Sequence, residues 1–316
     1  MPLMRPQDYP PQEPVSAFAQ AYTDDLISRI DPDAGENYFY GDDPYQSIAL
    51  FRPARPNGTI FAFMHGGGWT NGYKEMMGFM APAFTARGIL FASVGYRLAP
   101  MHHWPACFED SADAVAWLVK HAPDNGSNSA RIFIGGRSAG GHLASLLAVR
   151  NDWQDPRGLR QDALRGCVSV SGVYFFGEGS GFKNRPRFLG PVEQKNEIPA
   201  SPLLNIQGRP PPFLMAWGEK DFPHLIQQAR DMATALQAAG GEVETIVLAG
   251  CDHLGTWVPT GDPESPWMTR ALAFLAAPLN ANARFLFTCN AVSNRYIKSS
   301  RTFELNESTY NSAVSR

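Results

Sequence analysis

The sequence predicts an α/β protein in which helices flank a mostly parallel central sheet. Short apolar runs of strand length alternate along the chain with longer stretches of helical periodicity, and this alternation is typical of parallel sheets covered by helices. The 316 residues are 44% hydrophobic and 18% charged. A chain of this length and composition can bury a sizeable core and fits one large domain better than two small ones.

The predicted elements alternate regularly. Strands are expected at residues 47–51, 59–64, 90–94, 131–134, 166–170, 213–217 and 242–248. Helices are expected at residues 15–30, 74–87, 108–121, after the turn at residue 138, and at 225–239 and 266–276. Ligands of such sheets bind beyond the carboxyl ends of the strands, so the loops that follow the strands are where we expect functional residues.

The segment Gly136-Arg137-Ser138-Ala139-Gly140 lies between the strand at 131–134 and a helical pattern of leucines. A serine on a sharp strand-to-helix turn needs flanking glycines, because a side chain there would collide with neighbouring backbone. Such a short pattern also occurs in ordinary turns, so its context must decide. We expect Ser138 to be a nucleophile if partners are found elsewhere in the chain.

A second glycine-rich segment, His65-Gly66-Gly67-Gly68-Trp69, directly follows the strand at 59–64. Without Cβ atoms, the amides of Gly67 and Gly68 can turn inward and, with the amide of Ala139, surround an oxygen that becomes negative in a tetrahedral intermediate. Losing one such donor typically costs about 2.7 to 4 kcal/mol of transition-state stabilisation. We predict an oxyanion hole here, with a flexible turn as the alternative.

A nucleophilic serine needs a histidine base and a carboxylate that orients it. Among seven histidines, His253 follows a strand and a short loop, so it is expected to project beyond a strand end. Asp221 follows the strand at 213–217 in the same way. The order serine, acid, histidine is the one that this kind of turn requires. Glu219 in the same turn and Asp252 beside the histidine are alternative acids.

Together these motifs resemble the α/β-hydrolase superfamily. More narrowly, they are similar to the hormone-sensitive-lipase-like carboxylesterases and to the arylformamidase (kynurenine formamidase) branch beside them. The resemblance runs from about residue 45 to 277 and rests on the stretches 65–69, 94–100, 136–142 and 218–221 and on His253. It implies an α/β-hydrolase fold with an N-terminal cap-like helix, and it implies the roles already assigned to the catalytic and oxyanion-hole residues.

Some residues bear on the choice between the two branches. The stretches 171–174 and 200–203 resemble the formamidases, whereas Phe175 and Phe176 stand where formamidases often carry an acidic residue. Arg137 is an uncommon bulky cation at this point of the turn, where it marks either an unusual environment beside the nucleophile or a surface cation. Side chains predicted to line the substrate pocket, with ordinary packing as the alternative, are Trp69, Phe175, Phe176 and Trp257.

We therefore expect a serine hydrolase, without cofactor or metal, that cleaves a small-molecule carboxylic ester of a small to medium acyl group through an acyl-enzyme. An arylformamidase would use the same residues on an N-formylkynurenine-type amide. A ligand-binding relative without turnover would be expected to lack the histidine. No HExxH motif or tight cluster of histidine, cysteine and carboxylate side chains points to a metal.

Charge and composition exclude other classes of function. The net charge is only −3, from 27 basic and 30 acidic residues, and no basic block indicates nucleic-acid or membrane binding. Residues 1–14 are rich in proline and lack the apolar core of a secretory signal or membrane span. Four widely spaced cysteines are typical of reduced thiols, so we expect a cytoplasmic protein.

The chain is predicted to have three parts. Residues 1–44 form an N-terminal segment with the cap-like helix, 45–279 the catalytic domain, and 280–316 a C-terminal extension rich in asparagine and serine. The extension has no clear periodicity, so we expect a loosely attached arm. Its aromatic residues Phe285, Phe287 and Tyr296 are candidates for docking onto a partner subunit, so a homodimer is among the expectations.

Overall fold

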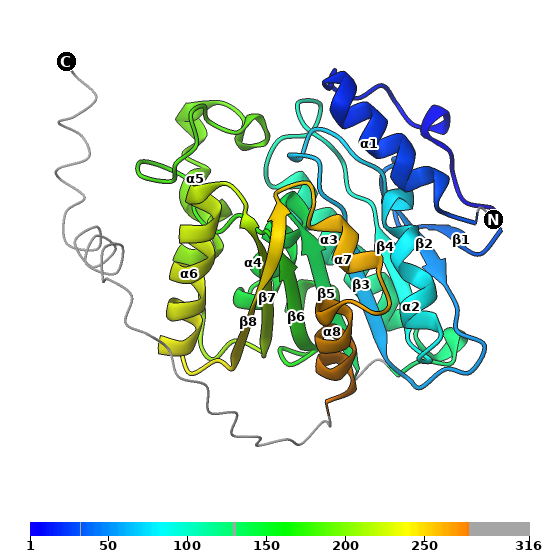
Figure 1. Cartoon of the computed structure of the whole chain (residues 1–316). Helices are drawn as coiled ribbons and strands as arrows, with labels where there is room; N and C mark the ends of the chain where they lie inside the picture. Colours follow the sequence, from blue (N-terminus) through cyan, green and yellow to red (C-terminus); the bar gives the residue numbers. More distant parts are fainter. Residues whose placement is uncertain (32, 129–130, 278–316) are drawn as a thin grey trace, which may run out of the picture. The chain divides into compact units, whose positions relative to one another are not determined.

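The computed structural model describes residues 1–31, 33–128 and 131–277. Within these ranges, strands form one sheet in the order β1-β2-β4-β3-β5-β6-β7-β8 (Figure 1). Their bounds are β1 (Glu36–Phe39), β2 (Ser47–Phe51), β3 (Ile60–Met64), β4 (Leu90–Val94), β5 (Ile132–Arg137), β6 (Leu164–Val170), β7 (Phe213–Lys220) and β8 (Val243–Asp252). The pairs β1–β2 and β2–β4 are antiparallel and the other neighbouring pairs are parallel, so the predicted mostly parallel sheet is confirmed.

Helices cover both faces of this sheet (Figure 1). The α-helices are α1 (Ala17–Ser28), α2 (Ala81–Thr85), α3 (Ala106–His121), α4 (Ala139–Val149), α5 (Glu197–Ala200), α6 (Pro223–Ala238), α7 (Trp257–Gly261) and α8 (Pro266–Ala276). Short 3-10 helices occupy Pro6–Asp8, Lys74–Met80, Pro123–Asn125, Asp155–Arg157, Arg187–Leu189, Val192–Gln194 and Pro202–Leu204. Ser16 and Ser265 cap α1 and α8, because each side-chain oxygen accepts a backbone N–H of the first turn.

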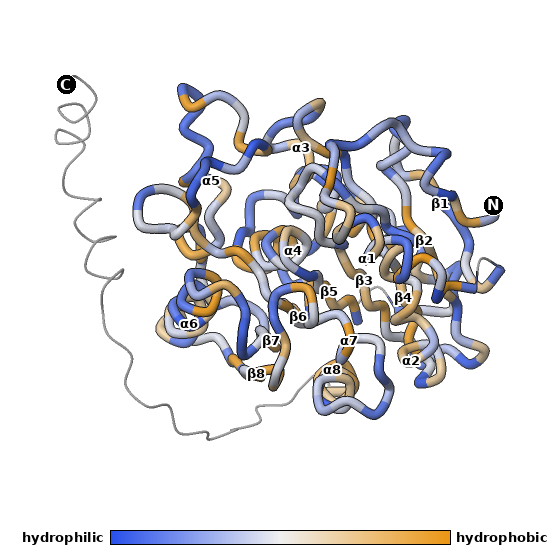
Figure 2. The backbone as a smooth tube through the Cα atoms, turned by 45° about the horizontal axis from the view of Figure 1, so that its top comes forward, coloured by the Kyte–Doolittle hydropathy of each residue, from blue (hydrophilic) through white to orange (hydrophobic). Residues whose placement is uncertain are grey.

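The core has two layers because successive side chains of a strand point to opposite faces of the sheet. In β3, Ile60, Ala62 and Met64 pack on the side of α3, α4 and α6. Phe61 and Phe63 pack on the side of α2 and α8. Strands buried on both faces read as continuous apolar runs, and Figure 2 shows hydrophobic colour along the central strands with hydrophilic colour on many outer loops.

Several elements differ from the sequence prediction. Residues 74–80 of the expected helix 74–87 form a 3-10 helix, and an α-helix begins only beside Pro82, because proline lacks the N–H that an α-helix interior requires. The short, half-exposed edge strand β1 was not predicted. Strands β7 and β8 extend through polar residues to Lys220 and Asp252, which pair with each other.

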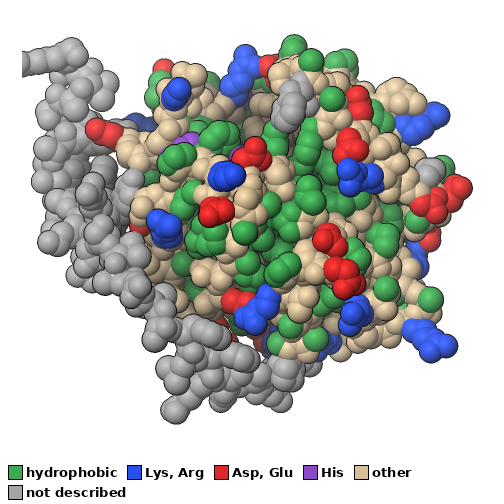
Figure 3. Space-filling model, viewed as in Figure 1, with side chains coloured by type: hydrophobic (Ala, Val, Ile, Leu, Met, Phe, Trp, Pro, Cys, Tyr) green, Lys and Arg blue, Asp and Glu red, His purple; other side chains and the backbone are tan. Residues whose placement is uncertain are grey.

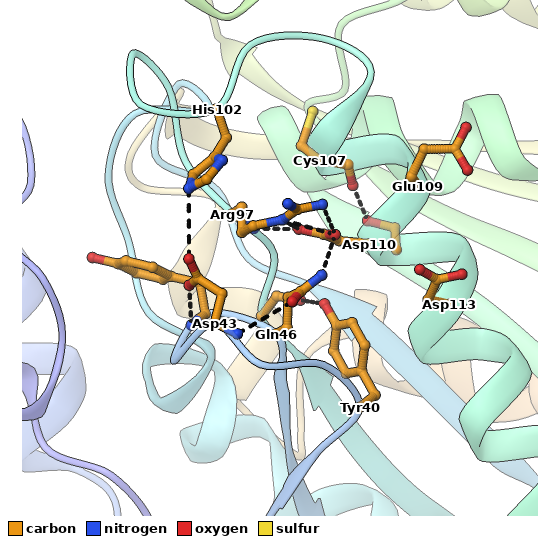
Figure 4. A network of polar contacts seen from close by, with 12 residues as sticks. Tyr40, Asp43, Gln46, Arg97, His102, Cys107, Glu109, Asp110 and Asp113 are labelled. Carbon is orange, nitrogen blue, oxygen red and sulfur yellow. Dashed lines mark hydrogen bonds and ion pairs between the residues drawn. The ribbon is translucent and has the colours of Figure 1, made fainter.

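A buried carboxylate fixes the loop that follows β4. Asp110 of α3 is fully buried, and both of its oxygens accept hydrogen bonds from Arg97 (Figure 4). The amide nitrogen of Gln46 also donates to Asp110 at 2.8 Å. In the same loop, the Tyr96 hydroxyl donates to the carbonyl of His65 at 2.8 Å. The stretch 94–100, on which the family resemblance partly rests, thus connects the β4 loop to the end of β3.

The predictions made for the C-terminal extension stay predictions. The C-terminal extension, with Cys289 and the three aromatic residues proposed for docking, lies outside the described residues.

The described cysteines, Cys107, Cys167 and Cys251, are free thiols. Among described helices, none combines the length and apolar character needed to cross a bilayer. Lysine and arginine side chains are interspersed with aspartate and glutamate on the face drawn in Figure 3.

Candidate active site

Three residues predicted from the sequence lie at the carboxyl ends of neighbouring strands. Ser138 directly follows β5, Asp221 follows β7, and His253 follows β8. Because Lys220 pairs with Asp252 in the parallel register of β7 and β8, the next residue of each strand emerges beside the other. The strand register therefore brings the acid and the histidine together.

The side chains of these residues form a continuous hydrogen-bonded row. The Ser138 hydroxyl lies 3.0 Å from His253 Nε2, and His253 Nδ1–H donates to Asp221 Oδ1 at 2.7 Å. The Asp221 side chain is fully buried, and the His253 side chain is 14% exposed. Ser138 is half-buried. This arrangement can transfer a proton from the hydroxyl to the imidazole while the carboxylate fixes the ring.

The two alternative acids point elsewhere. Glu219 is exposed, and its carboxylate accepts the backbone N–H of Gly250 at 2.8 Å. Asp252 is also exposed, and its carboxylate accepts the backbone N–H of Gly255 at 2.6 Å. The Glu219 carboxylate thus joins the ends of β7 and β8, that of Asp252 stabilises the turn after β8, and the contact with the histidine belongs to Asp221.

Sequence reasoning missed Ser171 as a partner of the acid. This residue directly follows β6, and its hydroxyl donates to Asp221 Oδ2 at 2.5 Å. The Phe222 N–H donates to Asp221 Oδ1 at 2.7 Å. Burial alone would raise the pKa of Asp221, but hydrogen bonds from His253, Ser171 and Phe222 together lower it. The signal was available, because Ser171 occupies a strand end like the three predicted residues.

The environment of His253 favours the neutral imidazole. Burial lowers its pKa most, the hydrogen bond to Asp221 opposes that effect, and the nearby charge of Arg137 lowers the pKa further. The net direction is downward from the ordinary value of 6.5. A neutral ring can accept the serine proton, so the site is electrostatically suited to a general base.

Arg137 is buried, so the surface alternative for this residue is wrong. It is only 3% exposed at the end of β5. Its guanidinium donates to the His253 carbonyl and, through Nε at 3.1 Å, to the Thr256 hydroxyl. The guanidinium carbon also lies 4.3 Å from the ring centroid of Trp257. The cation therefore belongs to the packing that surrounds the histidine.

The backbone of the serine turn explains its glycines. Ser138 has φ 54° and ψ −116°, an unfavourable conformation for a residue with a side chain. A Cβ at Gly136 would come within 2.3 Å of the Gly140 carbonyl, and one at Gly140 within 2.1 Å of the Met64 carbonyl oxygen. The predicted strand-to-helix turn is thus confirmed, and α4 begins at Ala139.

The glycine-rich loop is shaped by close backbone contacts. Gly67 has φ +120°, and a Cβ there would meet the Asn71 carbonyl oxygen at 1.9 Å. The Gly67 carbonyl accepts the N–H groups of Thr70 and Asn71 at 3.2 and 3.0 Å. Gly68 also has positive φ. The oxyanion-hole roles of Gly67, Gly68 and Ala139 stay predictions.

The residues predicted for the substrate pocket are mostly buried. Trp69 and Phe176 belong to an aromatic cluster in which Trp69 stacks on Phe188 with ring centroids 4.1 Å apart. Trp257 lies beneath Arg137, whereas Phe175 is half-buried. Their role in substrate binding stays a prediction.

An exposed aromatic side chain that was not predicted lies beside the histidine. Phe222 is 51% exposed, and its ring centroid is 5.0 Å from that of His253.

Among the described residues, histidine, cysteine and carboxylate side chains form no group of three that would suit a metal ion.

Comparison with known families shows the same fold. A family model described as alpha/beta hydrolase fold matches residues 61–256. A hyperthermophilic esterase from the archaeon Pyrobaculum calidifontis superposes with a TM-score of 0.64 at 20% identity, covering 80% of this chain and 89% of that one. At this level of identity the structural match supports the fold alone.

Curated relatives with similar sequences include two enzymes named for ester hydrolysis. Esterase LipC of Mycobacterium tuberculosis is 30% identical over 234 residues, which are 68% of this chain and 58% of that protein. Ethyl acetate hydrolase of Pseudomonas putida is 29% identical over 229 residues, which are 65% of this chain and 70% of that protein. The chain spans about half the length of several other curated relatives that it matches.

Proposed function

This chain belongs to the α/β-hydrolase fold family, and from the contacts at the ends of β5, β7 and β8 we propose that it is a serine carboxylesterase. The observation that carries the proposal is the pair of hydrogen bonds that joins Ser138 to His253 at 3.0 Å and His253 to Asp221 at 2.7 Å. The names of the sequence relatives support an ester rather than a formamide as the substrate.

In the first half of the reaction, His253 Nε2 accepts the proton of Ser138 as the serine oxygen attacks the ester carbonyl carbon. Asp221 holds the imidazole in the tautomer with the proton on Nδ1 and stabilises the imidazolium that forms. The N–H groups of Gly67, Gly68 and Ala139 hold the carbonyl oxygen as it becomes negative. His253 then returns its proton to the departing alcohol, which leaves an acyl-serine.

In the second half, water replaces the alcohol. His253 accepts a proton from the water as its oxygen attacks the acyl carbon. The tetrahedral intermediate then collapses to the carboxylic acid while His253 returns its proton to the departing Ser138 oxygen, which restores the free serine and the neutral histidine. Each half requires neutral His253 at its start. Because the pKa of His253 lies below 6.5, we expect kcat/KM to fall with decreasing pH only below that value.

Turnover of short p-nitrophenyl esters tests the proposal. Ser138→Ala should abolish hydrolysis, and Asp221→Asn should lower kcat by roughly 10⁴-fold while the protein stays folded, because the histidine then adopts the wrong tautomer. Glu219→Gln, which changes the neighbouring carboxylate, is the matched control and should retain activity. Rapid hydrolysis of N-formylkynurenine with negligible ester turnover would instead favour an arylformamidase.

A further inference from the structure

Arg137 occupies an unusual position for a cation, because it is buried and forms no direct ion pair with any carboxylate of the described residues. It is the last residue of β5 and is adjacent to Ser138 in the chain, yet only 3% of it is exposed. None of the ion pairs among the described residues involves it. Asp221 and Asp252 stabilise its charge only electrostatically, without a direct ion pair. A buried charge without a direct ion pair is unfavourable for folding, so its contacts call for a functional explanation.

The guanidinium contacts the segment that carries the histidine. It donates to the His253 carbonyl and, at 3.1 Å, to the Thr256 hydroxyl. The Thr256 hydroxyl itself donates to the same carbonyl at 2.9 Å. Trp257 supplies an aromatic face 4.3 Å from the guanidinium carbon, an arrangement that stabilises a cation away from water. We define residues 253–257 as the histidine loop.

Arg137 also lies beside Gly66, the first glycine of the glycine-rich segment. A Cβ at Gly66 would lie 3.1 Å from the Arg137 carbonyl oxygen and 3.4 Å from its guanidinium. On the other side, Tyr22 of α1 donates to the Leu254 carbonyl at 2.8 Å. The arginine thus lies between the nucleophile, the glycine-rich segment and the histidine loop, all of which must keep a fixed geometry.

From this geometry we propose that Arg137 is a positioning residue with two effects: it clamps the histidine loop against the nucleophile turn, and its buried charge disfavours protonation of His253. The inference rests on the proposed esterase function. It extends that function by assigning the acidic limit of activity to a residue that does not touch the substrate.

The other charged groups around His253 come from several elements. Asp221 at the end of β7 and Asp252 at the end of β8 favour the imidazolium, whereas Arg137 disfavours it. Tyr22 of α1 and the same two carboxylates interact electrostatically with the arginine. His224 of α6 interacts with Asp221.

Burial lowers the pKa of Arg137 to about 10. Its guanidinium therefore stays charged near neutral pH. In the wild-type protein Asp221 and Asp252 raise the pKa of His253 while Arg137 lowers it. Removing the arginine alone should therefore raise the pKa of His253 and favour the imidazolium.

Lowering the basicity of His253 has a consequence for the reaction. A less basic imidazole yields a more acidic imidazolium, which protonates the departing alcohol more readily. It also stays neutral at lower pH. The clamp keeps Nε2 aligned with the serine oxygen, so misalignment in its absence should reduce kcat more than it changes KM.

The test titrates His253 by NMR in the wild-type protein and in Arg137→Gln, with His253→Gln used to assign the resonance. Glutamine retains hydrogen-bonding groups but removes the charge. We expect the His253 midpoint to rise by roughly 0.5 to 1 pH unit, and the acid limb of kcat/KM to rise with it. Arg160→Gln, which removes an exposed guanidinium, is the matched control and should leave both unchanged.

Arg137→Lys separates the clamp from the charge and serves as the second variant if the glutamine protein does not fold. Lysine keeps the charge but lacks the planar fork, so kcat should fall roughly tenfold while the acid limb stays in place. Coincident His253 titrations in wild type and folded Arg137→Gln would overturn the charge effect. Wild-type kcat in Arg137→Lys would overturn the clamp. Absence of ester turnover in the wild type defeats the proposed function instead, and the NMR titration still decides the role of Arg137.

Discussion

At the scale of single residues, the site is a chain of hydrogen bonds in which each partner limits the freedom of the next. His253 is held on one ring nitrogen by Asp221 and faces Ser138 with the other. Asp221 is in turn held by Ser171 and by the backbone of Phe222. The supporting contacts matter because even a small displacement of the base slows nucleophilic catalysis.

Removing the Ser171 hydroxyl tests this dependence. Ser171→Ala leaves one oxygen of buried Asp221 without its 2.5 Å donor, and a hydrogen bond to a charged group contributes about 1.5–3 kcal/mol. We expect the pKa of Asp221 to rise and kcat to fall roughly tenfold with little change in KM. Steady-state kinetics on a short ester measure this. Ser28→Ala, an exposed serine, is the control, and equal kcat values in both variants would contradict the assigned role.

The sequence predicted Ser138, Asp221 and His253 because a strand end followed by a chemically reactive residue is a local pattern. The choice of Asp221 over Glu219 depended on where β7 ends, and the structure supports it through a strand register that no local pattern shows. The burial of Arg137 could not be predicted, since its partners Thr256 and Trp257 lie more than a hundred residues away in the chain.

At the scale of elements, the N-terminal segment holds the glycine-rich loop in place. The Gln12 side chain forms a two-way contact with Gly72: its Nε2 donates to the carbonyl and its Oε1 accepts the N–H, both at 2.8 Å. Asn71 donates to the Glu13 carbonyl at 2.6 Å. Because Asn71 also bonds to Gly67, the segment before α1 reaches the predicted oxyanion hole through one residue.

Gln12→Ala should therefore loosen the glycine-rich loop without touching the nucleophile. We expect kcat to fall roughly tenfold, because oxyanion donors act only when they are fixed in position, while labelling of Ser138 by a small electrophile persists. Gln20→Ala is the matched control, since Gln20 is exposed and bonds to Asp24 within α1. A Gln12→Ala protein with wild-type kcat would show that the loop keeps its shape alone.

Element boundaries were predicted best where strands are buried and apolar. The expected 47–51 and 90–94 strands coincide with β2 and β4. Prediction was weakest for β1, which is four residues long and half-exposed, so it lacks the hydrophobic pattern that burial imposes. The ends of β7 and β8 were missed for the same reason, because pairing continues after the apolar run stops.

At the scale of the whole molecule, two histidines in the core couple folding to pH. The His142 Nδ1 accepts the indole N–H of Trp69 at 3.0 Å, and its Nε2–H donates to the Ala200 carbonyl at 2.6 Å. Both ring nitrogens are thus satisfied only in the neutral form. His65 is buried against Tyr96 with ring centroids 4.4 Å apart. Burial lowers the pKa of each histidine from 6.5 to about 4.

Acid should therefore unfold this protein in a characteristic range. Below pH 6.5 the unfolded chain binds protons at both positions and the folded chain does not, so stability present above 6.5 is lost as the pH falls toward about 4. Each histidine contributes a slope of up to about 1.4 kcal/mol per pH unit. Urea unfolding at several pH values measures it. His142→Asn should remove one proton from the slope, and an unchanged slope would contradict the assignment.

Every step of the proposed reaction requires Ser138 as the nucleophile, and covalent labelling tests this role most directly. The protein is incubated with a fluorophosphonate probe, digested, and the adduct located by mass spectrometry. We expect a single adduct on the peptide that contains Ser138, slowed in His253→Gln and absent in Ser138→Ala. Labelling at another residue, or none in a protein shown to be folded, would contradict the role of Ser138 as the nucleophile.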